Sequence, residues 1–298
     1  MAKKTNPTPD ATKAPELEGV QITSADRILY EGSGITKGDV ARYYQAISSK
    51  IMPHLQGRII SGVRCPRGIE SACFFQKHPT NDLAGVATVS IKEADGGMGE
   101  YQTLTDARGL LSQVQMNALE FHPWGSSVDT LEKPDRLVFD LDPDAGMDLE
   151  SIRRGVRDLK GRLDQASLVS YLKTSGGKGY HVVVPLAPTS SWEKAHTFAQ
   201  SIAKKMENAW PDRYTSSARK DRREGRIFID WLRNGRGATS VAPYSLRARE
   251  GAPVSMPIAW KELDSVAPKD ITMKEAVSRA AGKDPWEGFF TARQALKG

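Results

Sequence analysis

Apolar residues recur along the chain with two spacings, one typical of helices and one typical of strands. Thr36 and Asp39 have the spacing of a capping box, and apolar residues follow at helical intervals until Pro53 and Gly57 end the pattern. The same signals predict three more helices, at 110–119 up to the His122-Pro123-Trp124 turn, at 148–163 and at 190–206.

Short apolar or alternating stretches between these helices predict strands. They lie at 59–63, 72–76, 137–141, 168–172, 180–184, 227–231 and 238–242. The stretches at 168–172 and 180–184 lie close enough along the chain to form a hairpin. Because strands and helices are interspersed without a regular order, the pattern favours a mixed α+β fold over a doubly wound sheet.

The stretch Arg136-Leu-Val-Phe-Asp-Leu-Asp142 places two carboxylates in a predicted strand. Alternate residues of a strand share a face, so Asp140 and Asp142 point the same way, about 6–7 Å apart. Neighbouring carboxylates repel one another unless a cation lies between them, and their oxygens suit Mg²⁺ or Mn²⁺. The alternative is a strand end that runs into a turn at 142–146.

A third acid lies in the predicted strand 227–231. Residues 227, 229 and 231 form an apolar face, and Asp230 lies on the other face. An acid inside an apolar strand is costly to bury without a partner. With Asp140 and Asp142 it would complete a two-metal site, whereas the alternative is a salt bridge from Asp230 to a nearby arginine.

The loop 173–181, Lys-Thr-Ser-Gly-Gly-Lys-Gly-Tyr-His, carries a second signal. Its glycines let backbone amides approach an anion closely, and Ser175 and Lys178 can donate to phosphate oxygens. The spacing is not that of a P-loop, and a strand follows where a helix should. An ordinary glycine-rich hairpin is the alternative. His181 opens the following strand, where it would either face a triphosphate or pack.

The charge distribution changes this picture more than the composition does. The net charge is +6, and six of the basic residues fall within 213–226. Such a concentration suits a polyphosphate or a nucleic-acid backbone, although a solvated surface loop would have the same composition. No apolar run approaches the roughly 20 residues that span a bilayer, so no membrane partner is expected.

The chain has two cysteines, Cys65 and Cys73, and its N-terminus lacks a secretory signal. The cysteines could pair, but this context predicts reduced thiols in a cytoplasmic protein, and two cysteines without matching histidines form no zinc site. Residues 1–17 are rich in Pro, Thr and Lys and are predicted to be a flexible tail or a linker. Residues 18–298 are predicted to form one domain.

Six separated motifs in one order resemble the polymerase domain of bacterial DNA ligase D, a member of the archaeo-eukaryotic primase superfamily. The resemblance covers about residues 20–290 and implies a primase-like catalytic fold, with central antiparallel or mixed sheets flanked by helices and a shallow cleft between strand layers. Tyr180 departs from the family, where a smaller apolar residue is expected. The motifs are ITKGDVARYY, GVRCPRGIESACFFQKH, LEFHPWGS, DRLVFDLDP, TSGGKGYHVVVPL and RIFIDWLRNGRGATSVAPYSLRAREGAPVSMPIAW.

The resemblance also implies roles for single residues. Two Mn²⁺ or Mg²⁺ ions would bind Asp140, Asp142 and Asp230. The incoming nucleoside triphosphate would be bound by Ser175, Lys178, His181, Arg233 and Arg247, with His122 near the ribose and the metals and with Phe74 and Phe75 stacked on a base. Lys37 and Arg27 would bind the 5′-phosphate on the far side of a gap, and Lys77 would also contact phosphates.

Several of these residues have simpler interpretations when taken singly. Phe74 and Phe75 could belong to the core, Lys37 could be a solvated first-turn residue, and His122 could be a satisfied turn histidine. For each of these residues both interpretations remain open.

Together these features predict a template-directed nucleotidyltransferase that extends a 3′-hydroxyl with nucleoside triphosphates and releases pyrophosphate. The resemblance adds manganese dependence, a preference for ribonucleotides, and filling of short gaps at double-strand breaks during bacterial end joining, together with a DNA ligase. Whether a Ku-like end-binding protein docks directly is left open.

Two rival hypotheses are a silent module that recognises a 5′-phosphate and bridges ends, and a primase that starts chains from two nucleotides. The sequence shows no ligase motif and no phosphoesterase region, so it fits either a stand-alone polymerase or an excised domain.

Overall fold

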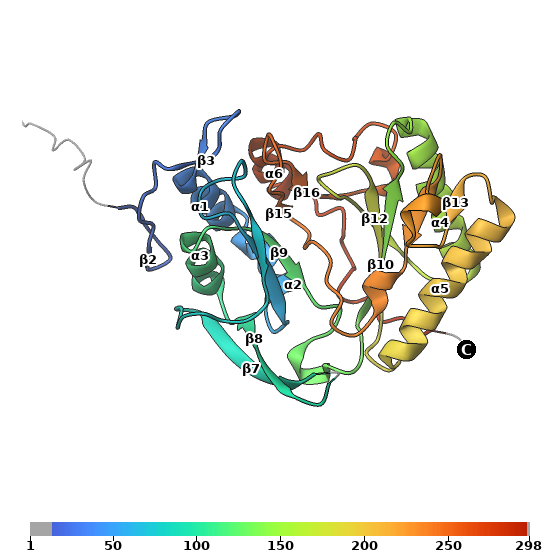
Figure 1. Cartoon of the computed structure of the whole chain (residues 1–298), viewed down its shortest axis with the longest axis horizontal. Helices are drawn as coiled ribbons and strands as arrows, with labels where there is room; N and C mark the ends of the chain where they lie inside the picture. Colours follow the sequence, from blue (N-terminus) through green and yellow to red (C-terminus); the bar gives the residue numbers. More distant parts are fainter. Residues whose placement is uncertain (1–13, 94, 297–298) are drawn as a thin grey trace, which may run out of the picture.

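A computed structural model describes residues 14–93 and 95–296 (Figure 1). Residues 1–13 of the predicted tail therefore lie outside the described residues. The described part contains six α-helices and six β-sheets, which confirms the predicted mixed α+β class. None of its helices is both long enough and apolar enough to cross a membrane.

The main sheet has six strands in the order β13–β14–β10–β12–β11–β17. All neighbours are antiparallel except β13 and β14, which makes the sheet mixed. The strands span β13 Tyr214–Thr215, β14 Ile227–Asp230, β10 Arg136–Pro143, β12 Tyr180–Pro185, β11 Tyr171–Thr174 and β17 Pro257–Ile258.

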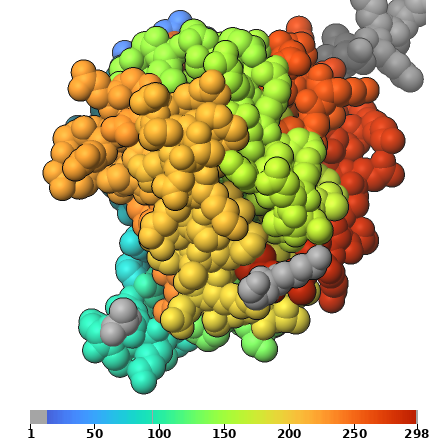
Figure 2. Space-filling model, turned by 90° about the vertical axis from the view of Figure 1, so that its right-hand side faces the viewer, coloured from blue at the N-terminus to red at the C-terminus, as the bar shows by residue number. Residues whose placement is uncertain are grey.

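Two long helices cover one face of this sheet. They are α4 (Leu149–Gln165) and α5 (Trp192–Ala209), which lie side by side on the outside of the molecule (Figure 2). Leu137, Phe139 and Leu141 of β10 are fully buried in the hydrophobic core on this side. Since side chains alternate along a strand, Asp140 and Asp142 are directed to the opposite face.

A second sheet lies in the other half of the molecule, in the order β6–β5–β9 (Figure 1). Its strands are β6 Phe74–Gln76, β5 Ile60–Arg64 and β9 Ala118–Pro123. The helices α1 (Lys37–Ala46), α2 (Ser48–Leu55) and α3 (Ala107–Gln115) pack on this half. A long hairpin of β7 (Val86–Lys92) and β8 (Met98–Leu104) projects from it (Figures 1 and 2).

The remaining elements are short. They are β1 Glu16–Leu17, β2 Val20–Gln21, β3 Ile28–Tyr30, β4 Ile35–Thr36, β15 Ser245–Leu246, β16 Val254–Ser255, α6 Met273–Ala280, and the 3₁₀ turns η1 Val128–Thr130, η2 Lys220–Arg222, η3 Leu232–Asn234 and η4 Trp260–Glu262.

Three sequence predictions about elements were wrong in part. The predicted helix at 110–119 ends at Gln115, because Asn117 has a positive φ of 65° and turns the chain into strand β9. The stretch 238–242 forms only an isolated bridge between Trp124 and Thr239 and no strand. The first helix is divided at Ile47 into α1 and α2, and Pro53 lies inside α2 instead of ending it.

The prediction of reduced thiols was also wrong, because Cys65 and Cys73 form a disulfide. The strand register explains why they meet. Strands β5 and β6 pair with Arg64 opposite Phe74, so the next residues outward are Cys65 and Cys73, with Cα atoms 4.4 Å apart. Sequence separation alone did not reveal this pairing.

Candidate nucleotide site

Four polar side chains lie in one row across the main sheet, on the face away from α4 and α5. Asp140 of β10 pairs in register with Asp230 on one side and with His181 on the other. His181 in turn pairs with Lys173 of β11. The register therefore brings three predicted site residues together and adds Lys173, whose Nζ is 2.6 Å from Ser255 Oγ.

Each acid of the predicted metal site faces a basic group. Arg233 Nε lies 3.0 Å from Asp230, Arg223 Nη1 lies 2.9 Å from Asp142, and His181 Nε2 lies 3.4 Å from Asp140. The salt-bridge alternative for Asp230 is thus present in this structure.

Burial makes this group of acids electrostatically costly. It raises the pKa of Asp140 to about 6, where Arg233 opposes the shift and the charges of Asp230 and Asp142 add to it. Burial also raises the pKa of Asp230, again against Arg233. Additional positive charge at this face would therefore be favourable.

The donor set fits a hard divalent cation, but the acids are not yet arranged around one. Within 14–93 and 95–296, no three His, Cys, Asp or Glu side chains already converge as a metal site. Asp142 and Asp230 are instead turned toward Arg223 and Arg233. Carboxylate oxygens are ligands that Mg²⁺ and Mn²⁺ prefer, so the chemistry of the donor set fits such a cation although two of the acids pair with arginines here.

The loop between β11 and β12 forms the wall of a cavity of about 330 Å³ beside these acids. Gly176 has a φ of +65°, and a Cβ at Gly179 would lie 1.9 Å from the Leu141 carbonyl oxygen, so both positions favour glycine. The cavity is lined by Asp140, Leu141, Asp142, Ser175, Gly177, Lys178, Gly179, His181, Arg233, Arg247 and Arg249. All five residues predicted to bind the triphosphate therefore line one cavity.

Ser175 organises the loop through both its side chain and its backbone. Its Oγ accepts hydrogen bonds from the N–H groups of Gly177 and Gly179, at 3.1 and 3.3 Å. The hydroxyl hydrogen remains available to donate to an anion. The Ser175 carbonyl accepts a 2.6 Å hydrogen bond from Arg247 Nη1, which ties the loop to the segment after β15.

Glu120 and His122 of β9 are connected to the cavity through Arg247, which lines it. Glu120 Oε2 lies 2.8 Å from His122 Nε2 and accepts from Arg247 Nε at 2.9 Å. Burial raises the pKa of Glu120, but these partners outweigh it and bring the pKa to about 2. Burial lowers the pKa of His122, with Glu120 opposing. Sequence analysis missed Glu120, although its spacing of two residues from His122 was a usable signal.

The predicted base-stacking residues lie at the edge of this sheet. Phe74 is 48% exposed and Phe75 is 50% exposed, so the alternative that they belong to the core is wrong. The ring centroids of Phe75 and His122 are 4.8 Å apart. His122 is a buried strand residue, so the alternative of a turn histidine is wrong about the turn, but Glu120 does satisfy its Nε2.

Arg27 and Lys37 meet at the start of α1, outside the cavity. The Lys37 N–H donates to the Arg27 carbonyl at 2.8 Å, and Arg27 Nη1 donates to the Pro66 carbonyl at 2.8 Å. Lys37 is only 1% exposed, so it is not a solvated residue. Lys77 lines a different cavity of about 420 Å³, with Lys92, Tyr101 and Arg236.

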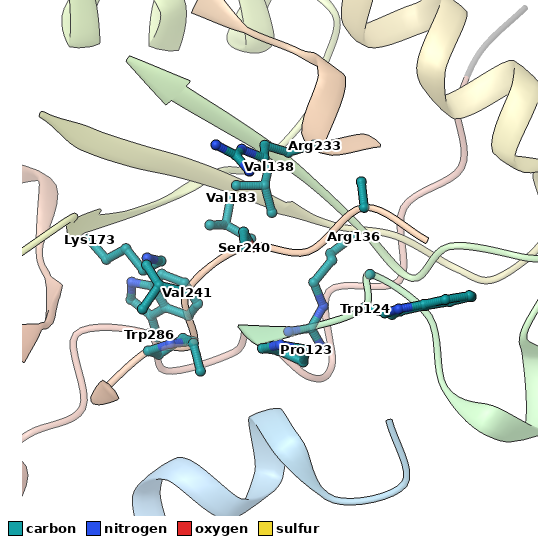
Figure 3. Close-up of a pocket in the computed structure, with 14 residues that line it drawn as sticks. Pro123, Trp124, Arg136, Val138, Lys173, Val183, Arg233, Ser240, Val241 and Trp286 are labelled. Carbon is teal, nitrogen blue, oxygen red and sulfur yellow. The ribbon is translucent and has the colours of Figure 1, made fainter. Parts of the chain in front are cut away.

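A narrow cavity of about 20 Å³ continues from the site along the same face of the sheet (Figure 3). Arg233 lines both this cavity and the one beside the acids, and Arg136, Lys173 and Trp286 also line the narrow cavity (Figure 3). This volume holds about one water molecule, so it does not accommodate a nucleotide.

The model of the LigD primase-polymerase domain family matches residues 36–286. The chain belongs to this family. It is 35% identical over 283 residues to the multifunctional non-homologous end joining protein LigD of Pseudomonas aeruginosa. The aligned region covers 93% of this chain and 34% of that protein. The LigD protein of Mycobacterium tuberculosis H37Rv is 34% identical over 273 residues, covering 88% of this chain and 36% of that protein.

A solved structure agrees with this assignment. The polymerase domain from Mycobacterium tuberculosis ligase D, in complex with DNA, superposes with a TM-score of 0.85 and 30% identity, covering 92% of this chain and 99% of that one. The predicted primase-like fold is therefore confirmed. The chain spans only about a third of the length of these curated relatives.

Proposed function

We propose that the chain is a template-directed nucleotidyltransferase that fills short gaps at double-strand breaks in bacterial end joining and prefers ribonucleotides. The observation that supports this proposal most directly is that the strand register places Asp140 opposite Asp230, beside the loop that contains Ser175. The chain in which this occurs belongs to the LigD primase-polymerase family. The related domain whose structure contains DNA supports DNA as the substrate. The names of the relatives support a role in end joining, with a DNA ligase to seal the product.

Asp140, Asp142 and Asp230 would hold two divalent cations, Mn²⁺ or Mg²⁺. When bound, the cations would activate the attacking 3′-hydroxyl and neutralise charge on the triphosphate and on the leaving pyrophosphate. The protein's own part is to release Asp142 from Arg223 and Asp230 from Arg233. The freed arginine side chains could then turn to the negatively charged nucleotide.

The cavity residues would bind and orient the triphosphate. Ser175 has a free hydroxyl hydrogen, Arg247 is held at two points, and Lys178 lines the same cavity. His181 is buried, and burial together with the charges of Lys173 and Arg247 lowers its pKa well below the usual value, so it would meet the nucleotide as a neutral imidazole. Positioning and charge stabilisation would supply most of the rate enhancement, without a covalent enzyme intermediate.

The nucleic-acid contacts would lie on the second sheet and on α1. The exposed rings of Phe74 and Phe75 would stack on a base without reading its identity. Arg27 and Lys37 would bind the 5′-phosphate across the gap. Because most of these contacts involve phosphates, the affinity for DNA should fall steeply with salt concentration.

The test is primer extension on a gapped duplex with a downstream 5′-phosphate, in Mn²⁺, with ribo- or deoxyribonucleotides. We expect templated addition that favours ribonucleotides and is abolished by Asp142→Ala, while binding of the duplex persists. Asp144→Ala is the matched control, because Asp144 lies two residues further along and accepts from the Gly225 N–H. Its activity should equal that of the unsubstituted chain.

Other outcomes would select the rival functions. Tight binding that depends on the 5′-phosphate, without any incorporation, would indicate an end-binding module. Synthesis without a primer from two nucleotides would indicate a primase. Equal loss of DNA binding and incorporation in Asp142→Ala would count against the metal assignment.

A further inference from the structure

Glu120 is a buried carboxylate at the candidate site, 5% exposed, whose partners are themselves predicted nucleotide ligands. Oε2 lies 2.8 Å from His122 Nε2 and 2.9 Å from Arg247 Nε. Oε1 accepts from the Ala248 N–H at 2.7 Å. The Glu120 side chain thus fixes both the imidazole of His122 on β9 and the guanidinium of Arg247, which follows β15.

The hydrogen bond to Glu120 determines which nitrogen of His122 carries the proton. A carboxylate with a pKa of about 2 is ionised at neutral pH and can only accept, so Nε2 of His122 is the donor. Burial lowers the pKa of His122, so the ring is neutral and has a single proton. Nδ1 is therefore left with a lone pair and can accept a hydrogen bond from a hydroxyl, but cannot donate to a phosphate.

The free nitrogen lies beside the base-stacking surface. Nδ1 of His122 makes no hydrogen bond within the described residues and, unlike Nδ1 of His181, is not sealed from solvent. The Phe75 ring lies 4.8 Å away from the imidazole. A nucleotide stacked on Phe75 with its phosphates near Arg247 would place its sugar between them, where the hydroxyl groups are the hydrogen-bond donors.

We propose that Glu120 is a positioning residue for sugar recognition, an inference that rests on the proposed function. It holds His122 in the form whose Nδ1 accepts from a ribose hydroxyl of the incoming nucleotide, and it aims Arg247 at the triphosphate. Arg247 is held from both sides, by Glu120 at Nε and by the Ser175 carbonyl at Nη1. The preference for ribonucleotides would then depend on a carboxylate that need not touch the nucleotide.

The kinetic test compares Glu120→Gln with Glu262→Gln. Glu262 is a matched control because it also accepts from an arginine and a backbone N–H, those of Arg279 and Ala259, in η4 outside the cavity. In Glu120→Gln the amide NH₂ can donate to Nε2, so His122 can take the other tautomer. We expect KM for ribonucleoside triphosphates to rise about tenfold, as for a lost charge-assisted hydrogen bond.

KM for deoxyribonucleotides should rise less, and kcat should change little. The ribo-over-deoxy ratio of kcat/KM should therefore fall, whereas Glu262→Gln should leave both sugars unaffected. Glu120→Asp retains the charge and should recover most of the preference. Equal effects on both sugars, or no effect, in a Glu120→Gln protein that melts like the unsubstituted chain would overturn the inference.

A spectroscopic test covers the case in which Glu120→Gln does not fold. The chain has five histidines, so ¹⁵N chemical shifts of His122 can be assigned by comparison with His122→Asn. The unsubstituted chain should show the Nε2–H tautomer at pH 7.5, and an Nδ1–H tautomer would refute the proposal. If the unsubstituted chain incorporates no nucleotide, the proposed function fails, whereas the tautomer still reports on Glu120.

Discussion

Lys37 shows how one buried charge could make recognition of a DNA end depend on pH. Burial, reinforced by the charge of Arg27, lowers the pKa of Lys37 to about 8. A bound 5′-phosphate favours the charged amine, so binding takes up the proton that free Lys37 loses as the pH rises above 8. The phosphate itself does not change charge in this range, because its second pKa is about 6.

We therefore predict that the affinity for a 5′-phosphorylated end falls about tenfold between pH 7 and pH 9, the loss expected when a required proton leaves a group of pKa near 8. Fluorescence anisotropy with phosphorylated and unphosphorylated gapped duplexes measures it. Lys37→Arg is the control, since its guanidinium stays charged throughout. A 5′-phosphate effect that is independent of pH in the unsubstituted chain would remove Lys37 from the phosphate site.

Local sequence motifs identified the residues predicted to contact metal or nucleotide better than the residues that only position those side chains. Asp140 and Asp142 share a strand face and could be placed from alternation alone. Glu120 had only its two-residue spacing from His122 as a local signal, and its second partner, Arg247, is 127 positions away in the sequence. Lys173 was recognised only as the start of a loop, since its position beside His181 depends on strand register.

At the scale of elements, the turn between β11 and β12 requires glycine for a steric reason. A Cβ at Gly179 would lie 1.9 Å from the Leu141 carbonyl oxygen, which is backbone of β10 and cannot easily move. The turn would have to shift away from β10, and with it the N–H groups bonded to Ser175 Oγ. The triphosphate side of the cavity would shift as well.

We predict that Gly179→Ala destabilises the fold by about 2 kcal/mol or more, as overpacking against backbone does, and raises KM for nucleotide at least as strongly. Gly161→Ala is the control, because Gly161 lies within α4 with nothing within 4 Å of its Cβ position. That substitution should stabilise the helix by about 0.5–1 kcal/mol. For both variants, urea unfolding measures the stability and nucleotide titration measures KM. A Gly179→Ala protein as stable as the unsubstituted chain would contradict the predicted clash with the Leu141 carbonyl.

Periodicity predicted the central strands better than the peripheral ones. Strands β10, β12 and β14 alternate or are apolar throughout, so their positions were predicted closely. Strand β9 is buried on both faces and continues the apolar pattern of α3. The predicted helix therefore extended past α3 into the first residues of β9. The hairpin of β7 and β8 was missed, because its residues are mostly half-buried or exposed and carry little apolar alternation.

At the scale of the whole molecule, the segment after α6 joins the two halves around the site. Trp286 packs with Val138, Val183 and Phe289 on the site face of the main sheet, and its Nε1 donates to the Leu172 carbonyl at 2.7 Å. Its ring also lies 5.7 Å from that of His54 in α2. This one side chain therefore contacts the main sheet and a helix of the other half.

We predict that Trp286→Ala lowers the free energy of unfolding by about 3–5 kcal/mol, as removal of a buried aromatic side chain generally does. The space left behind would enlarge the narrow cavity that Arg233 shares with the site, so KM for nucleotide should rise even in molecules that remain folded (Figure 3). Phe290→Ala is the matched control: this neighbouring ring also lies near His54 but is 51% exposed, so its removal should cost about 1 kcal/mol or less. Urea unfolding gives both free energies, and equal losses would show that Trp286 does not hold the halves together.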